Sequence, residues 1–143
     1  MLDTNICIYV INERPKTTIT MFRRHEPDDI GLSSITVSEL AFGVAKSKSI
    51  KNKVALEAFL LPLELHAFDE RAALMYGTVR AELERVGKGI GSLDTLIAAH
   101  ALSLGVPLVT NNYHEFRRVK GLKLENWISF MERARVVFPT RRR

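Results

Sequence analysis

"SLDTLIAAHALSLGVPLVT" (residues 92–110) decides the fold, because it places a helix directly before a buried strand. The helix begins at Ser92 and is apolar almost all the way round, which predicts that it is covered on several sides. Gly105 ends the helix, and residues 106–110 read as a short buried strand. A helix followed by such a strand is typical of a parallel sheet that is covered by helices.

The alternation of helices and strands continues on both sides of this stretch. Before it, the patterns predict helices near residues 5–11, 16–25, 37–46, 51–60 and 70–86, and strands near residues 29–36 and 63–68. After it, they predict a helical turn at 112–116, a strand near 122–124 and a helix from about 126. We therefore predict an α/β fold with a mainly parallel central sheet flanked by helices. With no linker or repeat, residues 1–143 form a single domain with a basic tail from about residue 133.

The composition fits a globular protein of the cytoplasm. Of the 143 residues, 46% are hydrophobic and 26% charged, and the formal net charge of +5 is compatible with a nucleic-acid partner. No apolar run is long enough to cross a membrane, and the start lacks the pattern of a secretory signal. The single cysteine, Cys7, predicts a buried, reduced thiol.

Four acidic residues lie where predicted strands meet predicted helices: Asp3, Glu39, Asp94 and Glu115. In parallel sheets, ligands bind beyond the carboxyl ends of the strands, so we expect these side chains at one edge. Crowded carboxylates repel one another and raise each other's pKa unless a cation is present. Oxygen ligands of this kind suit hard divalent ions such as Mg²⁺ or Mn²⁺.

Each acid also has an ordinary explanation as part of a helix start. Thr36 and Glu39 have the spacing of a capping box, as do Asn112 and Glu115. Asp94 lies in a first turn, where the helix dipole favours a carboxylate, and Asp3 can cap the helix that follows it.

Four segments of the chain carry a resemblance to a known family. They resemble, in order and spacing, the four signatures of PIN-domain ribonucleases, and more narrowly those of VapC toxins from bacterial type II toxin–antitoxin systems. The segments are "LDTNICIYVI" (2–11), "SSITVSELAFGV" (33–44), "RAELERVGKGIGSLDTLIAAHAL" (80–102) and "LVTNNYHEF" (108–116). The resemblance spans Leu2 to about Trp127.

The resemblance implies roles for these acids. Asp3, Glu39 and Asp94 are the acidic site residues, with Asp3 and Asp94 as ligands of Mg²⁺ or Mn²⁺ and Glu39 orienting a water. Thr4 and Thr110 adjoin the acids and hold their carboxylates as supporting residues.

The fourth signature departs from the family's pattern. The family commonly carries a further acid there, whereas this chain has Asn112 and keeps Glu115. Glu115 then takes the role of the fourth acid directly, acts through water, or only pairs with Asn112 at a helix start.

The resemblance also implies an activity and partners. It implies a metal-dependent endoribonuclease that cuts structured RNA such as tRNA and thereby inhibits translation. It also implies that this chain forms a homodimer and that a VapB-like antitoxin restrains its activity. Arg85 and Lys88 precede the third signature closely and are candidates for contacts with RNA phosphates. Two other interpretations remain: a PIN-type module that binds RNA without cutting it, and a small interaction protein whose acids only cap helices.

Very little sequence precedes the first signature. Members of the family normally carry an apolar strand there, but only Met1 and Leu2 stand before Asp3. A two-residue strand is expected to pair poorly. Either the start is clipped at an internal Met, which is the interpretation we favour, or Asp3 is held by unusually little structure.

Overall fold

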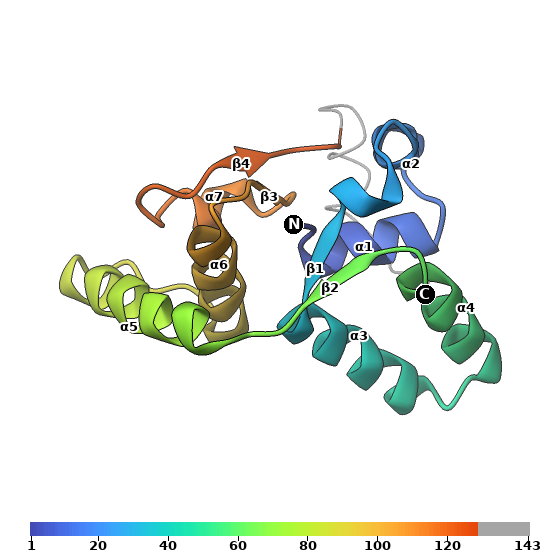
Figure 1. The fold of residues 1–143 in the computed structure, drawn as a ribbon, viewed down its shortest axis with the longest axis horizontal. Coiled ribbons are helices and arrows are strands. Elements are labelled where there is room, and N and C mark those ends of the chain that lie inside the picture. The colour runs from blue at the N-terminus through green and yellow to red at the C-terminus, as the bar shows by residue number, and fades with distance from the viewer. Residues whose placement is uncertain (129–143) are drawn as a thin grey trace, which may run out of the picture.

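The computed structural model describes residues 1–128 and has the predicted alternation of helices and strands (Figure 1). The helices are α1 (Thr4–Ile11), α2 (Lys16–Arg23), α3 (Ser34–Ser47), α4 (Ile50–Leu60), α5 (Glu70–Arg85), α6 (Ser92–Leu104) and α7 (Tyr113–Phe116), with a 3₁₀ turn at Pro27–Asp29. The strands are β1 (Gly31–Ser33), β2 (Glu64–His66), β3 (Leu108–Val109) and β4 (Leu124–Glu125). The predicted basic tail from about residue 133 lies outside the described residues.

The first three residues join two short pairs of parallel strands. β1 pairs with β2, and β3 pairs with β4. The N–H of Leu2 donates to the carbonyl of Gly31 at 3.1 Å, while the N–H of Asp3 donates to the carbonyl of Val109 at 2.9 Å. The start of the chain therefore lies between β1 and β3, where Figure 1 places the N-terminus. The expectation that so short a segment pairs poorly is wrong, because it bonds to a strand on each side.

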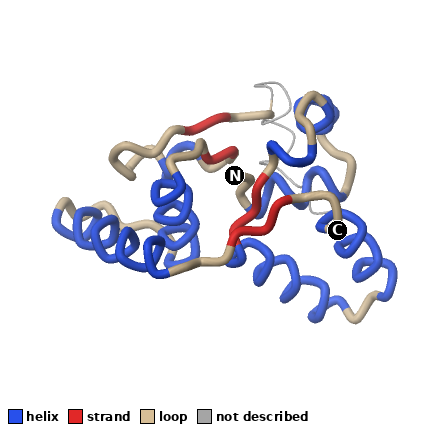
Figure 2. The backbone as a smooth tube through the Cα atoms, in the orientation of Figure 1, coloured by secondary structure: helices blue, strands red, loops and turns tan. Residues whose placement is uncertain are grey.

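Helices cover both faces of these strands, which confirms the predicted fold class (Figure 2). Leu2 and Val109 belong to a buried cluster with residues of α1, α3 and α4. Their neighbours Met1 and Leu108 belong to a second cluster with residues of α5 and α6. Successive side chains of a strand point to opposite faces, so these short strands separate the two halves of the core.

Local signals explain most helix boundaries. Asp69 caps α5 by accepting from the N–H of Ala72, and α6 ends at Gly105, whose φ of 66° is a left-handed conformation that suits glycine. The predicted cap at Thr36 is wrong. α3 begins earlier, because the hydroxyl of Ser33 accepts from the N–H of Ile35. Thr36 is instead buried inside α3.

Two further properties accompany this fold. Cys7 is buried as a free thiol, as predicted. Among the described residues, no helix is both long and apolar enough to span a membrane.

Candidate active site

Asp3 is both a helix cap and a buried carboxylate. One oxygen accepts from the N–H of Thr4 at 2.7 Å, which caps α1. The other accepts from the hydroxyl of Thr110 at 2.8 Å. The residue is only 4% exposed, and burial raises the pKa of its carboxyl, with the charge of Glu39 acting in the same direction. Asp3 is therefore held by strand and helix in a place that is unfavourable for its charge.

Glu39 lies on α3 and reaches toward Asp3 through a shared threonine. The hydroxyl of Thr4 donates to Oε1 of Glu39 at 2.7 Å, and the N–H of the same threonine bonds to Asp3. The predicted capping box between Glu39 and Thr36 is wrong, because Ser33 caps α3. Thr4 therefore connects the two carboxylates.

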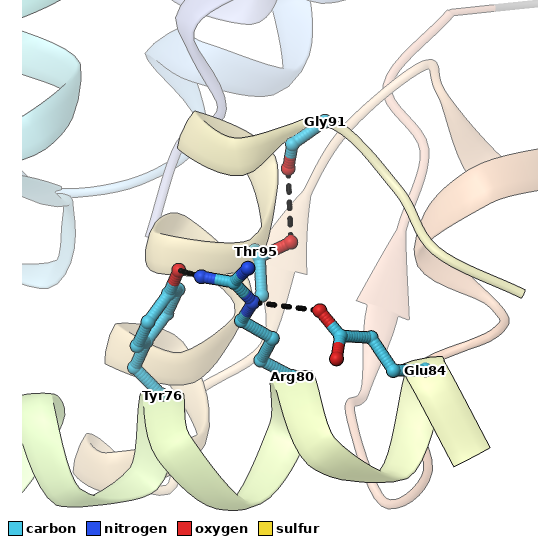
Figure 3. Close-up of polar contacts among 5 residues, drawn as sticks. All are labelled: Tyr76, Arg80, Glu84, Gly91 and Thr95. Carbon is cyan, nitrogen blue, oxygen red and sulfur yellow. Dashed lines mark hydrogen bonds and ion pairs between the residues drawn. The ribbon is translucent and has the colours of Figure 1, made fainter.

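Asp94 lies in the first turn of α6, which follows Gly91. Gly91 precedes the helix without a side-chain cap, and its carbonyl accepts from the hydroxyl of Thr95 at 2.9 Å (Figure 3). A Cβ on Gly91 would lie 3.4 Å from Oδ2 of Asp94, which is van der Waals contact. The chain thus approaches Asp94 closely at a position without a side chain.

Glu115 is held by the residue that stands in place of the expected fourth acid. The side-chain amide of Asn112 donates to Oε2 of Glu115 at 2.7 Å. The N–H of Asn112 donates to the hydroxyl of Thr110 at 3.0 Å. Asn112 makes no side-chain cap bond to α7, so the expected capping box is absent here too. Thr110 consequently links Asp3 to the turn that carries Glu115.

The four carboxylates act on one another electrostatically. Burial raises the pKa of Asp94 to about 6, and the charges of Asp3, Glu115 and Glu39 add to the rise. The structure therefore brings all four predicted acids into one neighbourhood, although they come from four separate segments. Carboxylates that repel one another in this way attract a cation.

By its chemistry this donor set suits a hard divalent metal ion, since it consists of carboxylate oxygens. Within residues 1–128, however, no three Asp, Glu, His or Cys side chains are arranged closely enough to hold a metal ion. Mg²⁺ is usually bound through one or two carboxylates and several waters, so a pair of these acids fits such an ion by its chemistry.

The two predicted RNA contacts lie at the end of α5 and in the turn that follows it. Arg85 forms a two-point ion pair with Glu82 on the exposed side of α5, with nitrogen–oxygen distances of 3.1 Å and 2.7 Å. Lys88 is exposed in the turn after α5. Arg80, on the same helix, bonds to Tyr76 and Glu84, as Figure 3 shows.

The sequence did not predict one contact near the carboxylates, between Asn111 and Tyr9. The side-chain amide of Asn111 donates to the hydroxyl of Tyr9 at 2.9 Å. Burial and, to a lesser extent, the charge of Asp3 raise the pKa of Tyr9. The only available signal was the first asparagine of "TNN" in the fourth signature.

Comparison with known proteins gives a consistent result. Residues 1–122 match the family model described as "PIN domain". The chain is 44% identical to "Ribonuclease VapC2" of Rickettsia felis and 41% identical to "tRNA(fMet)-specific endonuclease VapC" of Shigella flexneri, each over 89% of this chain and 96% of the relative. A solved structure of VapBC2 from Rickettsia felis, bound to a DNA fragment from its promoter, matches with a TM-score of 0.83 and 42% identity. That match covers 90% of this chain and 98% of the other.

Proposed function

The chain belongs to the PIN-domain family, and on that premise we propose that it is a metal-dependent endoribonuclease of the VapC type, the toxin of a toxin–antitoxin pair. The observation that carries this proposal is the mutual repulsion of its acids. Asp94 has a pKa of about 6 because it is buried near three other carboxylates. Relatives that are named ribonucleases align with this chain over nearly their whole length.

Asp3 and Asp94 would hold the metal, which we take to be Mg²⁺ or Mn²⁺. Such an ion, when bound, lowers the pKa of a water and neutralises charge on the attacked phosphate. Thr110 fixes one oxygen of Asp3 by donating to it, and Thr4 orients Glu39 in the same way. Glu39 is the acid that we assign to orienting the attacking water, because its held carboxylate lies next to Asp3 without capping a helix.

For Glu115 we propose the role of the fourth acid. Its carboxylate contributes to the raised pKa of Asp94 and is steadied by Asn112. The missing acid at position 112 is therefore compensated by an amide that orients the acid three residues later. The alternative is an impaired PIN-type module that binds RNA without cutting it.

The partners follow from the same relatives. We propose a tRNA substrate, since one relative is named a tRNA(fMet)-specific endonuclease, and a VapB-like antitoxin, since the similar structures are VapBC complexes. Cutting tRNA would inhibit translation. A homodimer of the toxin remains our proposal from the family resemblance.

The test is cleavage of a panel of purified tRNAs with Mg²⁺, with Mn²⁺ and with EDTA. Asp94→Asn should lower cleavage by more than about 100-fold, because loss of a metal ligand should exceed the loss of a supporting group. Asp28→Asn is the matched control, since Asp28 is exposed and outside the site. A folded protein that binds tRNA but never cuts it would support the binding module instead.

A further inference from the structure

Positive charge gathers in a hollow beside the acidic site. The hollow has a volume of about 680 Å³ and lies between the turn after α5 and the chain around and after α7. We call it the basic hollow and define it by Lys88, His114, Arg117, Arg118 and Lys120. An RNA strand carries one negative charge per phosphate, so the carboxylates themselves would repel it. A nuclease with such a site needs cations close by.

The charges of the basic hollow are largely uncompensated. Glu82 is the one acid among its lining residues, and this acid is already bound at two points by Arg85. The hydrogen bond and charge of Arg85 lower the pKa of Glu82, so the pair stays ionised at neutral pH. Among the described residues, neither Lys88 nor Arg117 takes part in an ion pair. Apart from the attraction between Lys120 and Glu82, the cations of the hollow are thus left for a ligand.

Two segments connect the basic hollow to the acidic site. Nη1 of Arg118 donates to the carbonyl of Gly89 at 3.0 Å, and two residues later Gly91 lies against Asp94. Two residues of chain span at most about 7 Å. His114 of the hollow directly precedes Glu115 on α7. The hollow is therefore next to the carboxylates, on the side of α6 and α7.

We propose that the basic hollow binds the phosphates of the RNA strand next to the bond that is cut, an inference that rests on the proposed function. Apart from Val86, the side chains that line it are charged or polar. A protein partner would be expected to find an apolar centre there, whereas interfaces with nucleic acids are more polar and strongly positive. Lys88 and Arg117 are exposed and contact the phosphates directly, while Arg118 also holds the wall of the hollow through Gly89.

The test compares two double variants that remove the same charge. Lys88→Gln with Arg117→Gln removes two cations of the hollow, and Lys46→Gln with Lys51→Gln removes two exposed cations from α3 and α4. Binding of an initiator tRNA transcript is measured at several salt concentrations, with Asp94→Asn added to every protein so that the tRNA is not cut. Cleavage is measured with the same proteins lacking Asp94→Asn. In the hollow variant, the plot of log affinity against log salt should be less steep than in wild type by about 1.4. This difference corresponds to about 25-fold weaker binding at about 0.1 M salt.

The outcomes separate this inference from the proposed function. An unchanged slope and unchanged kcat/KM in the hollow variant, beside a wild-type protein that cuts, would overturn the inference alone. Equal losses in both double variants would also overturn it, because they would indicate general surface charge. A wild-type protein that binds tRNA without cutting it would refute the proposed function, and the salt series would still decide the role of the hollow.

Discussion

Replacing Asp94 by asparagine should stabilise the metal-free protein at neutral pH. Burial and neighbouring carboxylates raise the pKa of Asp94 from an ordinary value of 3.8 to about 6. The folded protein therefore holds this proton more tightly than the unfolded chain does. The protonated carboxyl of Asp94 therefore adds to the free energy of unfolding below pH 3.8, and this contribution is lost as the pH rises through about 6. The asparagine side chain carries no charge at any of these pH values, so the variant avoids this loss.

The size of the effect follows from the pKa and from the exposure of the side chain. In a fully buried site, a rise from 3.8 to about 6 corresponds to about 3 kcal/mol. Asp94 is half-buried, and water screens part of the repulsion, so we expect about 1.5 kcal/mol. In a domain of this size, that difference raises Tm by about 5 °C.

Thermal unfolding followed by circular dichroism in EDTA measures this difference. The advantage of Asp94→Asn over wild type should be largest at about pH 7.5 and should shrink at about pH 5, where the folded wild type is mostly protonated at this position. Asp28→Asn, on an exposed residue, should differ little from wild type at either pH. If Asp94→Asn were less stable than wild type at both pH values, Asp94 would be a structural residue and the reasoning would be refuted.

Three more expectations follow from the same site. Mg²⁺ should raise Tm of the wild type but not of Asp3→Asn, because a ligand stabilises only the state that binds it; an equal rise in both proteins would contradict the assignment of Asp3. Thr110→Val should lower kcat/KM for tRNA by about 10- to 100-fold, since the hydroxyl that orients Asp3 is lost, and unchanged kinetics would remove Thr110 from the site. Asn112→Asp puts a second carboxylate where an amide now lies 2.7 Å from Glu115. The added negative charge should tighten Mg²⁺ binding, which calorimetry measures; weaker binding would place Glu115 outside the metal site.

The sequence predicted the fold well because its strongest signals are local. The apolar helix at residues 92–104, its end at Gly105 and the buried strand after it all occur as the pattern indicates. Bonds between distant segments were not predictable in this way. The pairing of residues 1–3 with both β1 and β3 depends on where residues 31 and 109 lie in space. The short start therefore looked poorly supported in the sequence although it is central in the structure.

In the candidate site, too, local features were predictable and bonds between distant segments were not. All four acids were identified from their positions at predicted junctions. The predicted partner of Glu39 was wrong, since Glu39 accepts from Thr4, whereas Glu115 does pair with Asn112, but through the side-chain amide and without a cap bond to α7. The capping-box spacing suggested partners three residues earlier in each case. Ser33 caps α3 before Thr36 can do so, and the side chain of Glu39 is left to accept from Thr4. A contact across 35 residues leaves no periodic signal in the chain.

The pKa of Asp94 helps to decide between two roles for these acids, capping a helix or binding a cation. A carboxylate that serves only a helix N-terminus is stabilised by the dipole and by N–H donors, which lower its pKa. Asp94 stands in a first turn, yet the N-terminus of α6 has no side-chain cap bond and the pKa of Asp94 rises to about 6. Its charge therefore opposes folding in the absence of a cation. Asp3 combines both roles, since one oxygen caps α1 while burial still raises its pKa. Capping accounts for where Asp3 lies but not for the burial of its charge near Glu39, and this burial is the observation that favours a bound cation.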